Sequence, residues 1–151
     1  MNDAIGPAPE RQALAAHSVE SLREEDCWSL LGARGIGRLA SIGADGGPDI
    51  FPVNTLLHER KVYFRSGPGM KLVQVTAEPR VAVEFDGGEP PWRWSVVIRG
   101  TARRLDRDDE IEASGVADLV SLSPTPKDDF VCVEPSAVSG RRFRTDYPSK
   151  G

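Results

Sequence analysis

The chain has 151 residues, about the length of one globular domain, and a formal net charge of −4. This acidic balance argues against the broad basic surface of a nucleic-acid-binding protein. Cys27 and Cys132 lie far apart and fit neither a zinc site nor a redox C-x-x-C motif. No apolar run approaches the length that spans a bilayer. We therefore expect one cytoplasmic domain with two buried thiols, no metal site and no nucleic-acid or membrane partner.

The first residues, 1–17, are rich in alanine and proline and show no periodicity, so we expect a flexible tail there. The single domain is expected over 18–146, followed by a short C-terminal tail over 147–151. At the start of this domain, Ser21 is followed three residues later by Glu24. This spacing is typical of a capping box and predicts the start of a helix.

Two predicted strands, 36–42 and 49–57, flank the sequence Ala44-Asp45-Gly46-Gly47, which is a strong hairpin turn signal. The second strand contains Pro52, and proline cannot donate a hydrogen bond to a sheet. We therefore expect a sheet edge or a β-bulge at Pro52. Either arrangement would leave backbone groups there accessible to a ligand.

A strand, a turn and a short helix follow one another between residues 61 and 78, and the turn has the sequence Arg65-Ser66-Gly67-Pro68-Gly69-Met70-Lys71. A helix start leaves backbone N–H groups without partners and carries the positive end of the helix dipole, so it favours an anion. Arg65 and Lys71 add two cations, and the glycines allow a ligand close to the backbone. The pattern favours a phosphate cradle, although an ordinary strand-to-helix turn also fits it.

The second half of the chain indicates further strands and one helix. Residues 80–86 alternate between apolar and polar, and a longer strand is predicted over 92–105. An acidic helix is predicted over 106–120, and a last antiparallel pair over 130–133 and 138–143. Short strands with hairpin turns and only peripheral helices predict a mainly β protein, a closed or nearly closed antiparallel barrel.

These motifs, in this order, resemble the split β-barrel family that binds flavin mononucleotide (FMN) and includes pyridoxamine 5'-phosphate oxidase. The segments that carry the resemblance are 37–40, 48–54, 62–66, 71–72, 83–86, 94–102 and 139–143. The resemblance implies a six-stranded antiparallel split β-barrel with short peripheral helices. It also implies an FMN cofactor and a homodimer with the cofactor at the interface.

The resemblance further implies roles for particular residues. Three would contact the cofactor phosphate, in agreement with the cradle: Arg65, Ser66 and Lys71. Three would place their backbone along the edge of the isoalloxazine ring: Pro52, Val53 and Asn54. Three would reach the cofactor of the partner subunit, although each also fits a packing or surface role: Trp94, Ser95 and Arg142.

Three functional hypotheses follow. The leading one is an FMN-dependent oxidoreductase that transfers hydride or electrons to a small-molecule acceptor, with no catalytic side chain assigned. The second keeps the fold but uses the deazaflavin coenzyme F420, whose longer anionic tail needs more basic residues. Candidates for that contact are Arg99, Arg103, Arg141 and Arg142. The third is a non-catalytic flavin or haem protein, for which His17 and His58 are poor axial ligands. Vitamin B6 oxidation is not expected, because the C-terminal arginines lack the arginine and histidine motif of pyridoxamine 5'-phosphate oxidase.

Overall fold

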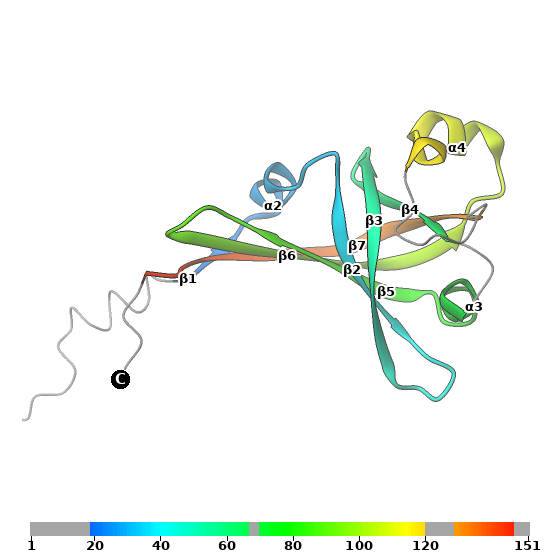
Figure 1. Ribbon diagram of the computed structural model, residues 1–151, viewed down its shortest axis with the longest axis horizontal. Coiled ribbons are helices and arrows are strands. Elements are labelled where there is room, and N and C mark those ends of the chain that lie inside the picture. The colour runs from blue at the N-terminus through cyan, green and yellow to red at the C-terminus, as the bar shows by residue number, and fades with distance from the viewer. Residues whose placement is uncertain (1–18, 67–69, 120–128, 147–151) are drawn as a thin grey trace, which may run out of the picture.

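The fold is mainly β, with short helices at its periphery (Figure 1). A computed structural model describes residues 19–66, 70–119 and 129–146. The elements, in chain order, are β1 (Val19–Leu22), α2 (Glu24–Leu30), β2 (Arg34–Ile42), β3 (Pro48–His58), β4 (Lys61–Ser66), α3 (Met70–Ala77), β5 (Arg80–Gly87), β6 (Trp92–Arg104), α4 (Asp108–Ser114), the 3₁₀ turn η1 (Val116–Asp118) and β7 (Asp129–Arg144). Both expected tails lie outside the described residues, as do the glycines of the predicted cradle.

Six of the strands form a closed antiparallel ring, in the order β7-β4-β3-β2-β5-β6, and the pairing of β6 with β7 closes it. The short strand β1 adds to the edge of β7. The ring confirms the predicted six-stranded barrel, and β1 is an addition that the sequence did not predict. No helix among the described elements is long and apolar enough to cross a membrane.

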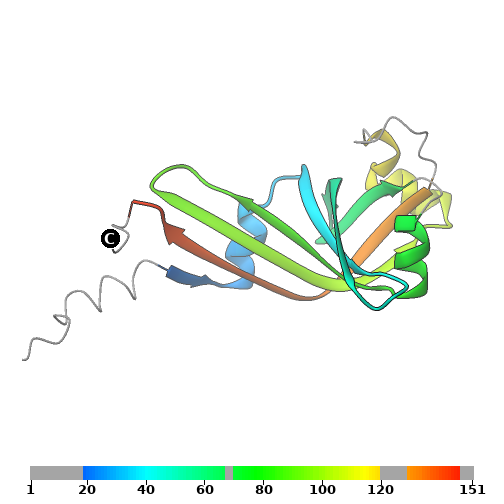
Figure 2. The same cartoon turned by 60° about the horizontal axis from the view of Figure 1, so that its bottom comes forward.

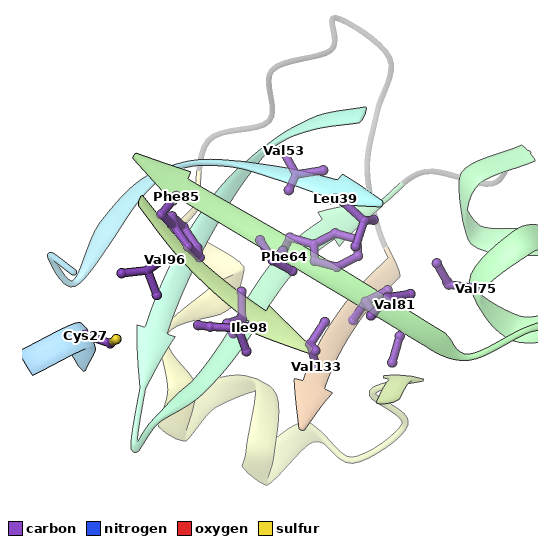
Figure 3. Close-up of a cluster of buried hydrophobic side chains, with 14 residues drawn as sticks. Cys27, Leu39, Val53, Phe64, Val75, Val81, Phe85, Val96, Ile98 and Val133 are labelled. Atoms are coloured by element: carbon purple, nitrogen blue, oxygen red, sulfur yellow. The ribbon is translucent and has the colours of Figure 1, made fainter. Parts of the chain in front are cut away.

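The main core fills the inside of this ring (Figure 3). Its largest fully buried side chains include Phe64, Leu39 and Ile98, each of which is 0% exposed. Along β5 and β6 every second side chain points inward, as the alternation of apolar residues predicted. Burial of these apolar side chains is the dominant favourable contribution to folding.

A second, smaller core lies where α4 and η1 pack outside β4 and β7. It contains Tyr63 and Cys132 from the strands and Val116 and Leu119 from the helical segment. Cys132 and Cys27 are both buried and free, which confirms the two predicted thiols. Burial raises the pKa of the Cys132 thiol, which disfavours its thiolate form.

The predicted pair of last strands, 130–133 and 138–143, is wrong. The structure has one long strand, β7, which pairs with β4 near its start and with β1 near its end. The segment around Pro135 is a β-bulge against β6 instead of a turn, because the register shifts between Arg99 and Gly100. A Cβ atom at Gly100 would lie 2.1 Å from the carbonyl oxygen of Glu134, so only glycine fits opposite the bulge.

Two helix predictions also need correction. Ser21 lies in β1, and α2 follows Arg23, whose side chain makes no capping hydrogen bond, so the predicted capping box does not form. The acidic helix predicted over 106–120 is divided by Gly115, which has a φ of 79°. A left-handed residue ends an α-helix, so α4 stops there and η1 follows. The last predicted residue of that helix lies outside the described residues.

Candidate functional site

The strands β3 and β4 separate halfway along, and the split between them is the candidate site. They pair only from His58 opposite Lys61 to Thr55 opposite Phe64. Beyond this point β3 continues beside β2, whereas β4 continues beside β7. The predicted ring-edge residues on β3 and the predicted cradle residues on β4 therefore lie on opposite sides of the split.

The register of the paired part shows which residues would oppose each other across the split. If it continued, Asn54 would stand opposite Arg65, and Val53 opposite Ser66. Asn54 and Arg65 directly adjoin the last paired positions of their strands, and Val53 and Ser66 lie one residue further along. The structure thus places two groups that are eleven or more positions apart in sequence on the two strands that border one split.

Pro52 lies on a part of β3 that pairs with β2 but not with β4. Its pairing with β2 is continuous from Arg34 opposite Leu56 to Ile42 opposite Pro48, so the predicted bulge is absent. On its other side β3 has no pairing with β4 at this level. Proline has no N–H to donate, so it is tolerated at such an edge. Of the two predicted alternatives, a β-bulge or a sheet edge, the structure has the edge.

Arg65 is held in place by the α4–η1 segment. Its Nη1 donates to the carbonyl oxygens of Leu119 at 3.0 Å and Ala117 at 3.4 Å. Its guanidinium also lies 5.5 Å from the ring centroid of Phe130, its direct partner on β7. Sequence reasoning missed Ala117 and Leu119 because every residue type has a backbone carbonyl that can accept a hydrogen bond, so the side chains give no signal.

The other cradle residues are described in part. Ser66 is 1% exposed at the end of β4. Lys71 belongs to the first turn of α3, and its side chain lies outside the described part of the chain. The first turn of α3 contains no acidic residue, so no carboxylate there opposes an anion at the helix start. The phosphate contact expected of Arg65, Ser66 and Lys71 stays a prediction.

Trp94, Ser95 and Arg142 lie on the arm formed by β5, β6 and β7, which extends away from β4 in both views (Figures 1 and 2). Trp94 and Arg142 are cross-strand partners. Arg142 forms an ion pair with Glu20 at 2.8 Å and stacks on Trp92 at 4.5 Å. One protomer therefore does not bring these three residues to the split.

The outer face of the sheet has a hollow of about 520 Å³, lined in part by Ser95 and Glu84. Burial, together with the neighbouring Asp86 carboxyl, raises the pKa of Glu84 to about 6. Nη1 of Arg38 lies 3.8 Å from Glu84 and 3.1 Å from Asp86. The alternation predicted for 80–86 implies that Glu84 and Asp86 share one face of their strand, but Arg38 joins them only through the pairing of β2 with β5.

The four arginines considered for a longer anionic tail do not gather at one place. Arg99 lines a second hollow of about 640 Å³, whereas Arg141 lines the smaller one. Arg103 is paired with Glu110 of α4, near the end of β6. Among the described residues, no group of three or more histidine, cysteine or acidic side chains is placed to hold a metal ion.

Comparison with known proteins finds a matching family, a similar sequence and solved structures of the same fold. Residues 23–142 match the sequence profile of the family described as Pyridoxamine 5'-phosphate oxidase. An uncharacterized protein of Mycobacterium tuberculosis is 33% identical over 89 residues, which are 59% of this chain and 81% of that protein.

Solved structures with the same fold include two described as FAD-binding proteins. The one from Mycobacterium smegmatis is 34% identical with a TM-score of 0.68, over 82% of this chain and 98% of the other. The one from Mesorhizobium loti is 28% identical with a TM-score of 0.69, over 82% of this chain and 96% of the other.

Proposed function

This chain belongs to the pyridoxamine 5'-phosphate oxidase family, and we propose that it binds a flavin in the split between β3 and β4. The observation that carries the proposal is that β3 and β4 stop pairing after Thr55 opposite Phe64. The split that begins there has the backbone of Pro52, Val53 and Asn54 on one side, and on the other a cationic strand end that leads into a helix start. The two FAD-binding relatives support a flavin as the ligand.

FMN is the proposed cofactor. Its phosphate would be bound by Arg65, Ser66 and Lys71, where a helix start and two cations favour a dianion. The isoalloxazine edge would lie along the β3 backbone. When bound, the flavin supplies hydride and electron transfer to a small-molecule acceptor, and the protein supplies orientation and a dry environment. No side chain is proposed as a catalytic acid or base.

We propose that a second copy of the chain covers the outer face of the sheet. Three isoleucines are exposed on β2 and β3 (Ile36 55%, Ile42 37% and Ile50 69%), although such side chains usually avoid water. Trp94, Ser95 and Arg142 would then approach the cofactor of the partner. Ile50→Asp should shift the protein to a monomer in light scattering, whereas Val73→Asp, at a 65% exposed position on α3, should not.

FAD is the second candidate cofactor, because two relatives at 28% and 34% identity are described as binding it. F420 is less well supported, since the arginines considered for its tail are dispersed. We also propose a cytoplasmic location, which the two buried free thiols favour. Flavin binding without turnover of any acceptor would favour a carrier over an enzyme.

The phosphate contacts provide the test of this proposal. Arg65→Ala and Lys71→Ala should each weaken FMN binding by about 1.5 to 3 kcal/mol, the scale of a charge-assisted hydrogen bond. Riboflavin has no phosphate, so its affinity should change much less. Arg99→Ala removes an exposed arginine outside the split and is the matched control. Equal losses for the two ligands would refute the phosphate assignment.

A further inference from the structure

One buried polar side chain ties α3 to the β2–β3 hairpin. Gln74 of α3 is 7% exposed, and Ser41 of β2 is 2% exposed. The Ser41 hydroxyl donates to Oε1 of Gln74 at 3.0 Å. Nε2 of Gln74 in turn donates to Oδ2 of Asp49, on β3, at 2.8 Å. The carboxamide is therefore used as an acceptor toward one strand and as a donor toward the next.

This bridge is more than space filling. The neighbouring Val75 of α3 packs into the main core, so an apolar residue at position 74 would also suit the buried face of the helix (Figure 3). A buried carboxamide costs desolvation unless both of its polar atoms find partners. It is satisfied only when α3 has one orientation relative to both strands, so the bridge fixes that orientation.

The position of the bridge connects the two halves of the candidate site. Gln74 lies about one turn from Met70, where α3 begins beside the cradle. Asp49 lies on the same strand as Pro52, three residues earlier. We propose that Gln74 is a positioning residue, which fixes the phosphate cradle relative to the strand that receives the flavin ring. This inference rests on the proposed flavin site.

The proposal makes a distinction between two ligands. FMN engages the cradle and the ring edge together, whereas riboflavin engages the ring edge alone. A change in the placement of α3 must therefore reduce the preference for FMN over riboflavin and leave riboflavin binding nearly unchanged. A loss of stability alone would leave the preference of the folded protein as it was.

The experiment measures dissociation constants of FMN and riboflavin, at a temperature where circular dichroism shows every variant folded. Gln74→Met keeps length and volume but removes both hydrogen bonds, and Ser41→Ala removes one of them. Thr76→Ala changes an exposed position of the same helix. Val96→Ala opens a cavity at a core position that is 0% exposed, and is the control for lost stability.

Gln74→Met should reduce the preference for FMN at least about tenfold, the scale of one lost charge-assisted contact, and Ser41→Ala should reduce it less. Thr76→Ala and Val96→Ala should keep the wild-type preference. If Gln74→Met does not fold, Gln74→Glu serves instead, because it sets a carboxylate against Asp49 and should lower the preference more at pH 7.5 than at pH 5.

Two results would overturn the inference in distinguishable ways. A wild-type preference for FMN that survives in Gln74→Met would refute the positioning role and leave the flavin site intact. A wild-type protein that binds neither ligand would refute the proposed site, and the positioning role with it.

Discussion

Glu84 gives the protein a dependence of stability on pH that a surface glutamate would not give. Its Oε1 is buried and makes no hydrogen bond within the described residues. Its Oε2 is 3.8 Å from Nη1 of Arg38, too far for a hydrogen bond, while Asp86 lies beside it. Burial first, and Asp86 second, raise the pKa of Glu84 from 4.5 to about 6.

The sign of the effect follows from this direction. The folded state holds the Glu84 proton more tightly than the unfolded state, so the neutral carboxyl stabilises the fold below pH 4.5 and that stabilisation is lost as the pH rises through about 6. A rise of this pKa from 4.5 to about 6 corresponds to about 2 kcal/mol. The side chain keeps 31% of its exposure, and solvent screening reduces this to about 1 kcal/mol.

The variant Glu84→Gln keeps the shape and removes the titration. We expect its free energy of unfolding in urea to exceed that of the wild type by about 1 kcal/mol at pH 7.5, with the difference nearly absent at pH 4.5. Glu112→Gln makes the same chemical change at an exposed position of α4 and should leave the profile unchanged. A Glu84→Gln variant that is less stable than the wild type at pH 7.5 would show that the carboxylate is paired and would refute this reasoning.

Two further substitutions test the packing. Gly100→Ala places a methyl group against the carbonyl oxygen of Glu134. It should destabilise the fold by about 2 kcal/mol or more in thermal unfolding. An unchanged melting temperature would mean that the bulge can relax. Arg60→Ala removes a guanidinium that lies 5.7 Å from the Trp28 ring centroid and is paired with a carboxylate of α2. It should alter Trp28 fluorescence with only a small change in melting temperature, and an unaltered spectrum would contradict the stacking.

Local patterns were sufficient for most of the barrel. The alternation in β5 and β6 identified the buried side chains, and the proline in β3 indicated a sheet edge. The segment around Pro135 was predicted as a turn because a bulge and a turn share the same local residue preferences. The bulge forms at Pro135 because Gly100, its partner on β6, leaves room for it. Gly100 is 35 positions away in sequence, so the residues around Pro135 give no local signal of this pairing.

The candidate site shows the same limit. Residue types indicated an anion site at Arg65 and Lys71, because cations and a helix start can be recognised along the chain. That Arg65 and Asn54 border one split depends on which strands pair and where the pairing ends, which the sequence does not display. Gln74 was missed for the same reason, since a glutamine within a short helix indicates neither burial nor a bridge to two strands.

The central claim is that the split between β3 and β4 recognises a flavin through its phosphate. The measurement that tests it most directly is a titration of the purified wild-type protein, free of cofactor, with FMN and riboflavin in parallel, and with FAD and F420 as competitors. We predict that FMN binds at least about tenfold more tightly than riboflavin, as one or more charge-assisted phosphate contacts require. Equal affinity for FMN and riboflavin, or binding of neither, would contradict the claim.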